Sequence, residues 1–185
     1  MEPIFFVAPL VLTLLLREVG EFALRPGARR MRGQGQSSLY VWYVAYLTNL
    51  AFALWHCWST PLIDQSWAGY AIVWVGMALR FAAMRELGVF YDVLIFLQTD
   101  HQLIDTGPYR WLRHPLHLGL HFEMLGLAVL ADSAIPLGVF VASLSVCAWR
   151  NLEEERALEG HFGAAYRDYR TRAWDVVDIL PGRHK

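Results

Sequence analysis

The chain has 185 residues, enough for one domain, and 56% of them are hydrophobic. This apolar content is high for a soluble domain, and the formal net charge of −1 gives no indication of nucleic-acid binding. Eight tryptophans and eight tyrosines supply amphipathic rings of the kind that gather at membrane–water interfaces. Cys57 and Cys147 both lie inside apolar runs, where we expect small core side chains rather than a disulfide or a metal site.

Five apolar segments follow one another along the chain. A membrane-spanning helix needs roughly 20 apolar residues, with a range of about 17–25. The first three segments meet this length, and the last two are shorter and are joined only by Asp-Ser-Ala, which predicts a tight helical hairpin. The first segment follows an acidic start and has no small-residue cleavage site, so we expect a retained helix rather than a signal peptide. The segments are about 3–24, 39–58, 67–87, 116–131 and 135–152.

Arginines are distributed unevenly among the connections between these segments. The second and fourth connections contain no Lys or Arg, whereas the first and third connections and the C-terminal tail are basic. By the positive-inside rule, this alternation places the N-terminus outside and the C-terminus in the cytoplasm. The basic residues of the first and third connections are Arg25, Arg29, Arg30, Arg32, Arg110 and Arg113.

These patterns predict an all-α integral membrane protein with about five transmembrane helices, the last two forming a tight hairpin, and a cytoplasmic C-terminal helical tail. In the tail, Gly163 indicates a break that is followed by a short second helix carrying Tyr166 and Tyr169. We divide the chain into two N-terminal transmembrane helices, residues 1–66, and a core, residues 67–185. The core contains helices three to five, a polar loop over residues 88–115 and the tail.

A polar stretch, residues 101–114, precedes the fourth apolar segment. Gly107-Pro108 is a turn signal, and Pro115 stands where a helix favours proline, in its first turn. We therefore expect an ordered loop over the entrance of helix four, whose free amides favour an anion or a polar ligand. Tyr109 and Trp111 add ring faces that suit a flat ligand or a cation.

A second polar cluster lies where helix five leaves its apolar segment. Arg150 and Glu154 are four residues apart and therefore share a helical face. This helical phase favours Glu154 over Glu155 as the acid that faces the same pocket as Arg150. Because the hairpin makes helices four and five antiparallel neighbours, the two polar clusters should converge into one pocket. Interface anchoring and a solvated helix face are the alternative explanations for these charges. For Arg17, Glu18 and Glu21 we expect local pairing.

Three histidines also raise the question of a metal site. His114, His117 and His121 are spaced i, i+3 and i+7 on one side of a helix, and imidazoles bind zinc or iron. The first and last are two turns apart, roughly 10 Å along the axis. One ion would therefore reach only an adjacent pair, and we predict no metal site.

Two groups of motifs resemble a known family, the isoprenylcysteine carboxyl methyltransferases and their prokaryotic relatives. That superfamily also includes phospholipid and thiol methyltransferases and, more distantly, membrane sterol reductases. The resemblance covers about residues 70–172, and the two groups stand in the family's order, about 40 residues apart and separated by a hairpin. The matching residues are His101-x-Leu103, Gly107-Pro108-Tyr109-Arg110, Arg113-His114-Pro115, Gly119, Glu154-Glu155-x-x-Leu158 and Phe162-Gly163-x-x-Tyr166-x-x-Tyr169.

The resemblance implies a membrane methyltransferase that uses S-adenosyl-L-methionine, with residues 67–185 as the methyltransferase core and residues 88–115 as the cofactor loop. It implies that Arg150 contacts the methyl acceptor and that Glu154 holds a polar end of the cofactor. Family members commonly have Tyr where His117 stands, which affects the acceptor more than the cofactor. The implied cofactor-binding residues are His101, Gln102, Leu103, Ile104, Gly107, Tyr109, Arg113, His114, Pro115, Leu116, His117 and Glu154.

The acceptor is expected to be a small lipophilic molecule that enters from the bilayer. A carboxylate is favoured because it arrives ionised and Arg150 suits it; an amine or a thiol is the alternative. An amine must lose a proton, for which His117 and Glu155 are the candidates. A nicotinamide-dependent reductase of the same superfamily and a non-catalytic membrane scaffold are two competing hypotheses. We expect membrane lipids and no nucleic acid as partners, and a location in the bacterial inner membrane.

Overall fold

The computed structural model of the chain is helical throughout its regular elements. It describes residues 4–24, 36–61, 64–91, 102–175 and 178. Within these ranges the β contact is a single isolated parallel bridge between Leu112 and Trp174. The elements are α1 Ile4–Leu24, α2 Gln36–Ser59, α3 Trp67–Leu87, η2 Gly88–Phe90, η3 Gly107–Arg110, α4 Pro115–Leu130, α5 Ala134–Phe162 and α6 Ala164–Arg172.

Local sequence signals account for several helix ends. Ser66 and Ser133 cap α3 and α5, and each side-chain oxygen accepts a hydrogen bond from a backbone amide, as in the N-cap arrangement. Pro115 begins α4, where its missing N–H costs nothing because first-turn amides have no helical partner. Gly163 has a φ of 58°, a left-handed conformation that suits glycine, and it ends α5 and starts α6.

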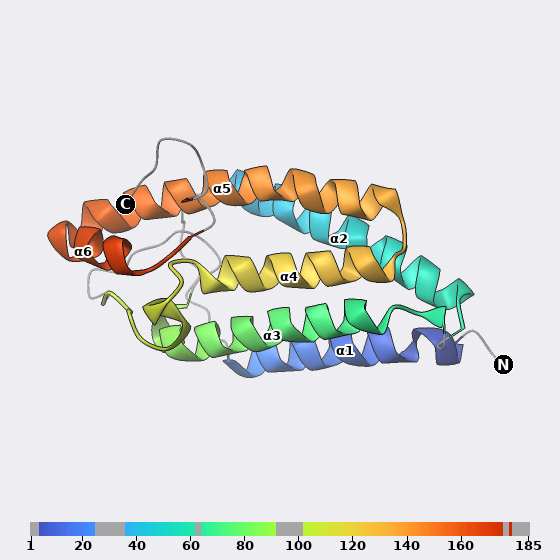
Figure 1. Cartoon of the computed structure of the whole chain (residues 1–185). Helices are drawn as coiled ribbons and strands as arrows, with labels where there is room; N and C mark the ends of the chain where they lie inside the picture. Colours follow the sequence, from blue (N-terminus) through green and yellow to red (C-terminus); the bar gives the residue numbers. More distant parts are fainter. Residues whose placement is uncertain (1–3, 25–35, 62–63, 92–101, 176–177, 179–185) are drawn as a thin grey trace.

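The five long helices lie side by side and alternate in direction along the chain (Figure 1). α4 contacts α2, α3 and α5, and its contact with α3 is the most extensive between any two described elements. α4 and α5 are joined by residues 131–133, so the predicted hairpin is confirmed. The start of α1 and the short helix α6 lie at opposite ends of the bundle (Figure 1).

Two pairs of glycines bring the backbones of α3 and α4 together. A Cβ at Gly76 would lie 2.5 Å from the carbonyl oxygen of Gly119, and a Cβ at Gly119 would lie 2.8 Å from that of Gly76. Gly69, seven residues before Gly76, and Gly126, seven residues after Gly119, oppose each other in the same way, at 2.9 and 2.6 Å. Small residues at such crossings let helices approach closely enough for dense van der Waals packing, which drives helix association in an apolar environment. We call these four residues the glycine seam.

A buried group of four charges joins α1 to this pair of helices. Arg17 Nε donates to Glu123 at 2.8 Å, and Arg80 donates to Glu123 at 3.0 Å and to Glu21 at 3.1 Å. Arg17 also pairs with the exposed Glu18, and these pairings offset the cost of removing Arg80, Glu21 and Glu123 from water. The expected local pairing of Arg17 is therefore only part of its role, since its partner Glu123 is 106 residues away.

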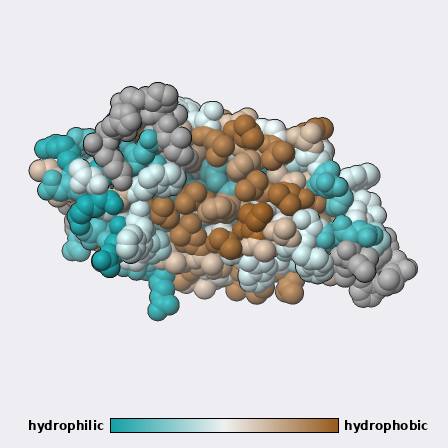
Figure 2. All heavy atoms as spheres, viewed as in Figure 1, coloured by the Kyte–Doolittle hydropathy of each residue, from teal (hydrophilic) through white to brown (hydrophobic). Residues whose placement is uncertain are grey.

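The outer surface carries an apolar belt between polar ends. Figure 2 shows hydrophobic side chains gathered over the middle of the bundle and hydrophilic ones toward its ends. Two helical stretches, Trp67–Phe90 and Ala134–Phe162, are long and apolar enough to cross a membrane, and α4 is a shorter apolar helix. Exposed apolar residues on this surface include Leu12, Leu15, Val19, Phe22, Trp55, Val75, Ile135 and Val141.

The predicted helices are present, with two shifted boundaries. α2 begins at Gln36 rather than about 39, and α5 continues to Phe162, ten residues beyond its apolar segment. The added part of α5 contains four glutamates together with Arg156, Ala157 and Leu158, which favour helix even where the helix leaves an apolar environment. The predicted break at Gly163 and the short helix after it are confirmed. Cys57 and Cys147 are buried and free, as expected of core side chains.

The glycine seam gives a direct stability test. We expect Gly76→Ala to destabilise the fold by about 1–3 kcal/mol, because the added methyl group meets backbone rather than a flexible side chain. Thermal unfolding in detergent measures the effect. Gly138→Ala on α5 is the matched control, because nothing lies within 4 Å of its Cβ position, and it should leave the midpoint unchanged or raise it. Equal midpoints for the two variants would contradict the role of the seam.

Candidate active site

The loop before α4 is fixed by the C-terminal tail. The hydroxyl of Tyr169 on α6 donates to the carbonyl oxygens of Tyr109 at 2.7 Å and Leu112 at 3.2 Å. The amide of Arg113 donates to the carbonyl of Trp174 at 2.9 Å, and the Trp174 amide donates to the carbonyl of Trp111 at 2.8 Å. The tail therefore closes over the loop and holds its described part, residues 102–114, in one conformation.

Arg113 links the same loop to α5 and the tail. Its side chain is fully buried, and the guanidinium lies 2.9 Å from Glu155 and 2.6 Å from Asp178. It also donates to the carbonyls of Arg170 and Ala173. These contacts use its charge and its donors within the protein, so its part in a site is to hold the loop in place. Glu155 faces Arg113, which leaves Glu154 facing the cavity, as the helical phase predicted.

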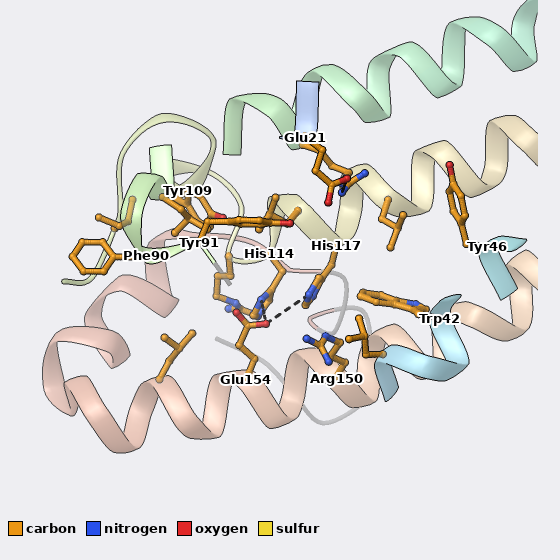
Figure 3. A pocket seen from close by; sticks show the side chains of 18 of the residues that line it. Glu21, Trp42, Tyr46, Phe90, Tyr91, Tyr109, His114, His117, Arg150 and Glu154 are labelled. Atoms are coloured by element: carbon orange, nitrogen blue, oxygen red, sulfur yellow. Dashed lines mark hydrogen bonds and ion pairs between the residues drawn. The ribbon is translucent and has the colours of Figure 1, made fainter. Parts of the chain in front are cut away.

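A cavity of about 430 Å³ lies between the loop, the tail and all five long helices, α1 to α5. This volume falls in the range of roughly 300–1,000 Å³ that is typical of small-molecule sites. Aromatic and aliphatic side chains form most of its wall, and a small set of charged groups faces inward (Figure 3). The Arg, Glu and His residues that line the cavity are Arg17, Glu18, Glu21, Arg80, Arg113, His114, His117, Arg150 and Glu154.

One end of the cavity combines an acid with aromatic rings. Glu154 lies 3.5 Å from Nδ1 of His114 and 3.7 Å from Nε2 of His117, and the two imidazole rings are stacked with centroids 5.5 Å apart. Tyr109 and Tyr166 line the same end. The Tyr166 hydroxyl is buried, and no described residue forms a hydrogen bond with it. A buried hydroxyl without a protein partner on a cavity wall suits a polar ligand group.

His114 is held as a cation. Burial alone would lower its pKa, but the charge and hydrogen bond of Glu154 and the nearby Glu155 outweigh burial and raise the pKa from 6.5 to about 10. The two carboxylates lie 3.5 and 3.9 Å from the ring nitrogens. At neutral pH this end of the cavity therefore contains an imidazolium paired with Glu154, which fixes the carboxylate in the direction of the cavity.

The other end of the cavity is formed around Arg150 and Trp42. Arg150 is 3% exposed, its Nη1 donates to Ser38 at 3.1 Å, and its guanidinium lies 5.8 Å from the Trp42 ring centroid. The wall near Trp42 is mixed, because apolar side chains of α2 adjoin Arg17, whose guanidinium lies 4.9 Å from the Tyr46 ring centroid. Two lining residues of α2, Tyr43 and Leu47, are 48% and 57% exposed, so this part of the wall also belongs to the outer surface of the bundle.

The structure brings most of the predicted site residues to this one cavity. Gly107 and Pro115 do not line it but shape the backbone: Gly107 has a φ of 55°, and Pro115 starts α4. His101 lies outside the described residues. The predicted residues that line the cavity are Gln102, Leu103, Ile104, Tyr109, Arg113, His114, Leu116, His117, Arg150 and Glu154.

Sequence reasoning missed the contribution of α1 and α2. Arg17, Glu21, Trp42 and Tyr46 line the cavity from these two helices, so residues 1–66 and the proposed core share one site. The charges of α1 were a signal, because charged residues inside an apolar segment are costly and usually face the interior of a bundle. Nothing in the local pattern indicated that Arg17 would reach α4.

The histidines do not converge on one point. His121 Nδ1 lies 2.9 Å from the carbonyl of His117, and its Nε2 lies 3.4 Å from Ser143, on the side away from Glu154. In the described part of the chain, the metal-type groupings are His114 with His117 and Glu154, and His114 with Glu155 and Asp175. Both contain His114, whose ring nitrogens lie 3.5 Å from Glu154 and 3.9 Å from Glu155.

The sequence model of the phospholipid methyltransferase family matches residues 64–165, more than half of the chain. This chain belongs to the phospholipid methyltransferase family. The matched residues include the loop that precedes α4 and the polar end of α5, which form the Glu154 end of the cavity.

Within this family the chain is similar to protein-S-isoprenylcysteine O-methyltransferases. It is 32% identical over 148 residues to the one from Mus musculus, covering 75% of this chain and 52% of the relative. It is 30% identical over 121 residues to the one from Dictyostelium discoideum, covering 64% and 50%. The chain spans about half the length of the curated relatives it matches. The resemblance to the isoprenylcysteine carboxyl methyltransferases is confirmed.

A solved structure shares the fold. It is described as the eukaryotic intramembrane Ras methyltransferase ICMT, and it matches with a TM-score of 0.70 at 19% sequence identity. The match covers all of this chain and 70% of that one. The all-helical architecture predicted from the sequence is therefore confirmed, and family, fold and apolar belt together support a location in a membrane.

The charge of His114 makes stability depend on pH. Because its pKa is raised on folding, its stabilising effect is complete below the unfolded value of about 6.5 and is lost as pH rises through about 10. We expect the thermal midpoint in detergent to fall from pH 7 to pH 10. His114→Gln should flatten this decline, whereas His161→Gln, at an exposed histidine of α5, should keep it. A decline of the same steepness in all three proteins would contradict the His114–Glu154 pair.

Proposed function

We propose that the chain is an integral membrane methyltransferase that transfers the methyl group of S-adenosyl-L-methionine to a lipophilic acceptor. The observation that carries the proposal is the single cavity in which Glu154, the Tyr109–His114 loop and Arg150 converge. Relatives named for methylation of protein isoprenylcysteine support the reaction class. Bound to the cavity, the cofactor supplies an electrophilic methyl group on a sulfonium.

The Glu154 end of the cavity fits the cofactor. The carboxylate of Glu154 suits its ammonium or ribose hydroxyls, and the cavity-lining rings of Tyr109 and Tyr166 suit its adenine or its sulfonium. The buried Tyr166 hydroxyl offers a further hydrogen bond. His101, which the resemblance places in the same set, is proposed as a contributor, as are Gly107 and Pro115 through their effect on the loop backbone.

The Arg150 end of the cavity fits the head of the acceptor. A carboxylate is favoured because it arrives ionised and accepts hydrogen bonds from a guanidinium. Arg150 then orients one carboxylate oxygen toward the methyl group, and correct orientation supplies most of the rate of such a displacement. The α2 side chains that line the cavity beside Trp42, among them the exposed Tyr43 and Leu47, accommodate a hydrocarbon tail that enters from the bilayer. Whether that tail belongs to a small molecule or to a lipidated protein is decided by assaying both.

We also propose the topology. All five long helices cross the bilayer, with the N-terminus outside and the loop, the tail and the cofactor end of the cavity in the cytoplasm. The arginine distribution and the placement of α1's start and α6 at opposite ends of the bundle support this arrangement. The inner membrane of a bacterium is the expected location.

Cofactor affinity tests the proposed function. We expect titration calorimetry of the detergent-purified chain to show micromolar binding of S-adenosylhomocysteine and no binding of a reduced nicotinamide dinucleotide. Glu154→Gln should weaken binding by at least about tenfold, because a charge-assisted hydrogen bond contributes roughly 1.5–3 kcal/mol. Glu159→Gln is the matched control, since this acid on the same helix pairs with exposed Arg167 and lies outside the cavity.

The outcomes separate the competing functions. Binding of a nicotinamide dinucleotide instead of S-adenosylhomocysteine would contradict the methyltransferase proposal and support a reductase. Binding of neither ligand by folded protein would leave a scaffold without this activity. Equal losses of S-adenosylhomocysteine affinity in Glu154→Gln and Glu159→Gln would show that Glu154 is not part of the cofactor site.

A further inference from the structure

The two ring nitrogens of His117 have different surroundings: one faces the protein interior and the other faces the cavity. It lies in the first turn of α4 and lines the cavity, with its Trp42 neighbour at a ring-centroid distance of 4.7 Å. Its Nδ1 lies 2.6 Å from Oδ1 of Asn151, behind the cavity wall. Its Nε2 lies 3.7 Å from Glu154, on the cavity side (Figure 3). The side chain therefore presents one nitrogen to the protein and the other to a bound molecule.

The neighbouring groups decide which nitrogen of His117 carries the proton. The side-chain amide of Asn151 donates from Nδ2 to both oxygens of Asp175, at 2.9 and 3.1 Å. A carboxylate only accepts, so the amide nitrogen must face Asp175 and the amide oxygen must face His117. Cys147 Sγ also points its weak donor at that oxygen, at 3.8 Å. The Nδ1 of His117 is therefore the N–H donor to Asn151, and Nε2 of the neutral ring carries a lone pair.

This arrangement is buried. Asn151 is 1% exposed and Asp175 is 5% exposed, so their hydrogen bonds are largely shielded from solvent. A buried chain of hydrogen bonds in which every member is satisfied holds a single orientation. Asp175 thus acts on His117 through Asn151, from the tail segment that also closes over the loop before α4.

The surroundings of His117 also suit the charge that forms when Nε2 accepts a proton. The charged groups that face the ring are Glu154 and Arg150 of α5 and His114 at the start of α4. The two cations favour the neutral ring before a reaction. After proton uptake, the new N–H points toward the Glu154 carboxylate while Asn151 continues to accept from Nδ1. An orienting acceptor on one nitrogen and a free lone pair on the other is the arrangement that a general base requires.

We propose that His117 is a general base that extends the reaction to lipophilic acceptors that arrive with their proton, a primary amine or a thiol. The inference rests on the proposed function. The acceptor nitrogen or sulfur gives its proton to Nε2 of His117 and forms a bond to the methyl carbon. The carbon–sulfur bond of the sulfonium donor breaks, and its electron pair stays on that sulfur. Asn151 and Asp175 are positioning residues that hold the tautomer.

A matched set of acceptors tests the proposal. Dodecanoate, dodecylamine and dodecanethiol share one tail and differ in the head, so methyl transfer from labelled S-adenosylmethionine to each gives a ratio of rates for the full chain. General bases contribute about 10²–10⁴-fold, so His117→Gln should lower the amine-to-carboxylate or the thiol-to-carboxylate ratio by at least about 100-fold. His161→Gln, at an exposed histidine outside the cavity, is the control and should leave both ratios unchanged.

The pH profile separates a base from a structural role. In the wild-type chain the rate should be level over the pH range in which His117 is neutral and the acceptor still carries its proton. In His117→Gln the proton must leave to solvent, so the rate should rise about tenfold per pH unit up to the acceptor's own pKa. Parallel profiles for the two proteins would overturn the proposal.

A readout without turnover tests the tautomer itself. Nitrogen-15 NMR of histidine-labelled protein distinguishes a protonated from an unprotonated ring nitrogen, and the signals absent from His117→Gln identify this residue. We expect Nδ1–H alone in the wild type and a mixture of tautomers in Asp175→Asn, where an amide at position 175 no longer fixes Asn151. An Nε2–H tautomer in the wild type would overturn the proposal.

The failure of this inference differs from the failure of the proposed function. Absence of S-adenosylhomocysteine binding would contradict both the proposed function and the general-base inference. Binding together with transfer to dodecanoate, but to neither the amine nor the thiol, would overturn the base and keep the methyltransferase. Transfer to the amine or thiol that depends on His117 would establish the base, and the two acceptors show which head the site takes.

Discussion

The direct approach of α3 and α4 along the glycine seam sets the geometry on which the site depends. Because Gly69 and Gly76 meet Gly126 and Gly119 backbone to backbone, α4 is fixed in depth and rotation against α3. That rotation directs Glu123 toward α3 and α1, and it leaves the first turn of α4 directed at the cavity. A side chain inserted at the seam would separate α3 from α4. It would then disturb both roles of α4, which anchors α1 and lines the cavity.

Charge pairing then connects elements that packing alone would leave independent. Arg80 of α3 and Glu123 of α4 continue the seam as an ion pair, and Arg17 extends it to α1. At the other end of α4, Arg113 joins the loop to Glu155 and Asp178. Buried charges are costly without partners, so each pair restricts its helices to one relative position. The cavity keeps a defined shape because all of its walls are tied to α4.

The sequence predicted the helices well because their signals are local. The length of apolar runs, Pro115 at a helix start and Gly163 at a break each act within a few residues. The convergence of the loop with α5 was also predictable, because a short connection makes α4 and α5 neighbours. The choice of Glu154 over Glu155 followed from helical phase and agrees with the structure.

Contacts between residues that are far apart in the sequence could not be predicted from sequence patterns. The partnership of Arg17 with Glu123 depends on how α1 is rotated in the bundle, which no spacing within α1 defines. Asn151 and Asp175 carried no signal, since one lies inside a helix and the other in an irregular tail, yet together they orient His117. Arg113 was expected to contact a ligand and is instead engaged within the protein, because the fold brings Asp178 and two tail carbonyls to it.

The central claim is that one cavity binds the methyl donor at its Glu154 end and leaves its Trp42 end to the acceptor. An experimental structure of the full chain with S-adenosylhomocysteine tests this most directly. The account predicts ligand density beside Glu154, His114, Tyr109 and Tyr166, with the wall beside Trp42, Tyr43 and Leu47 clear of it. Density at the Trp42 end, or at another site with the Glu154 end unchanged, would contradict the account.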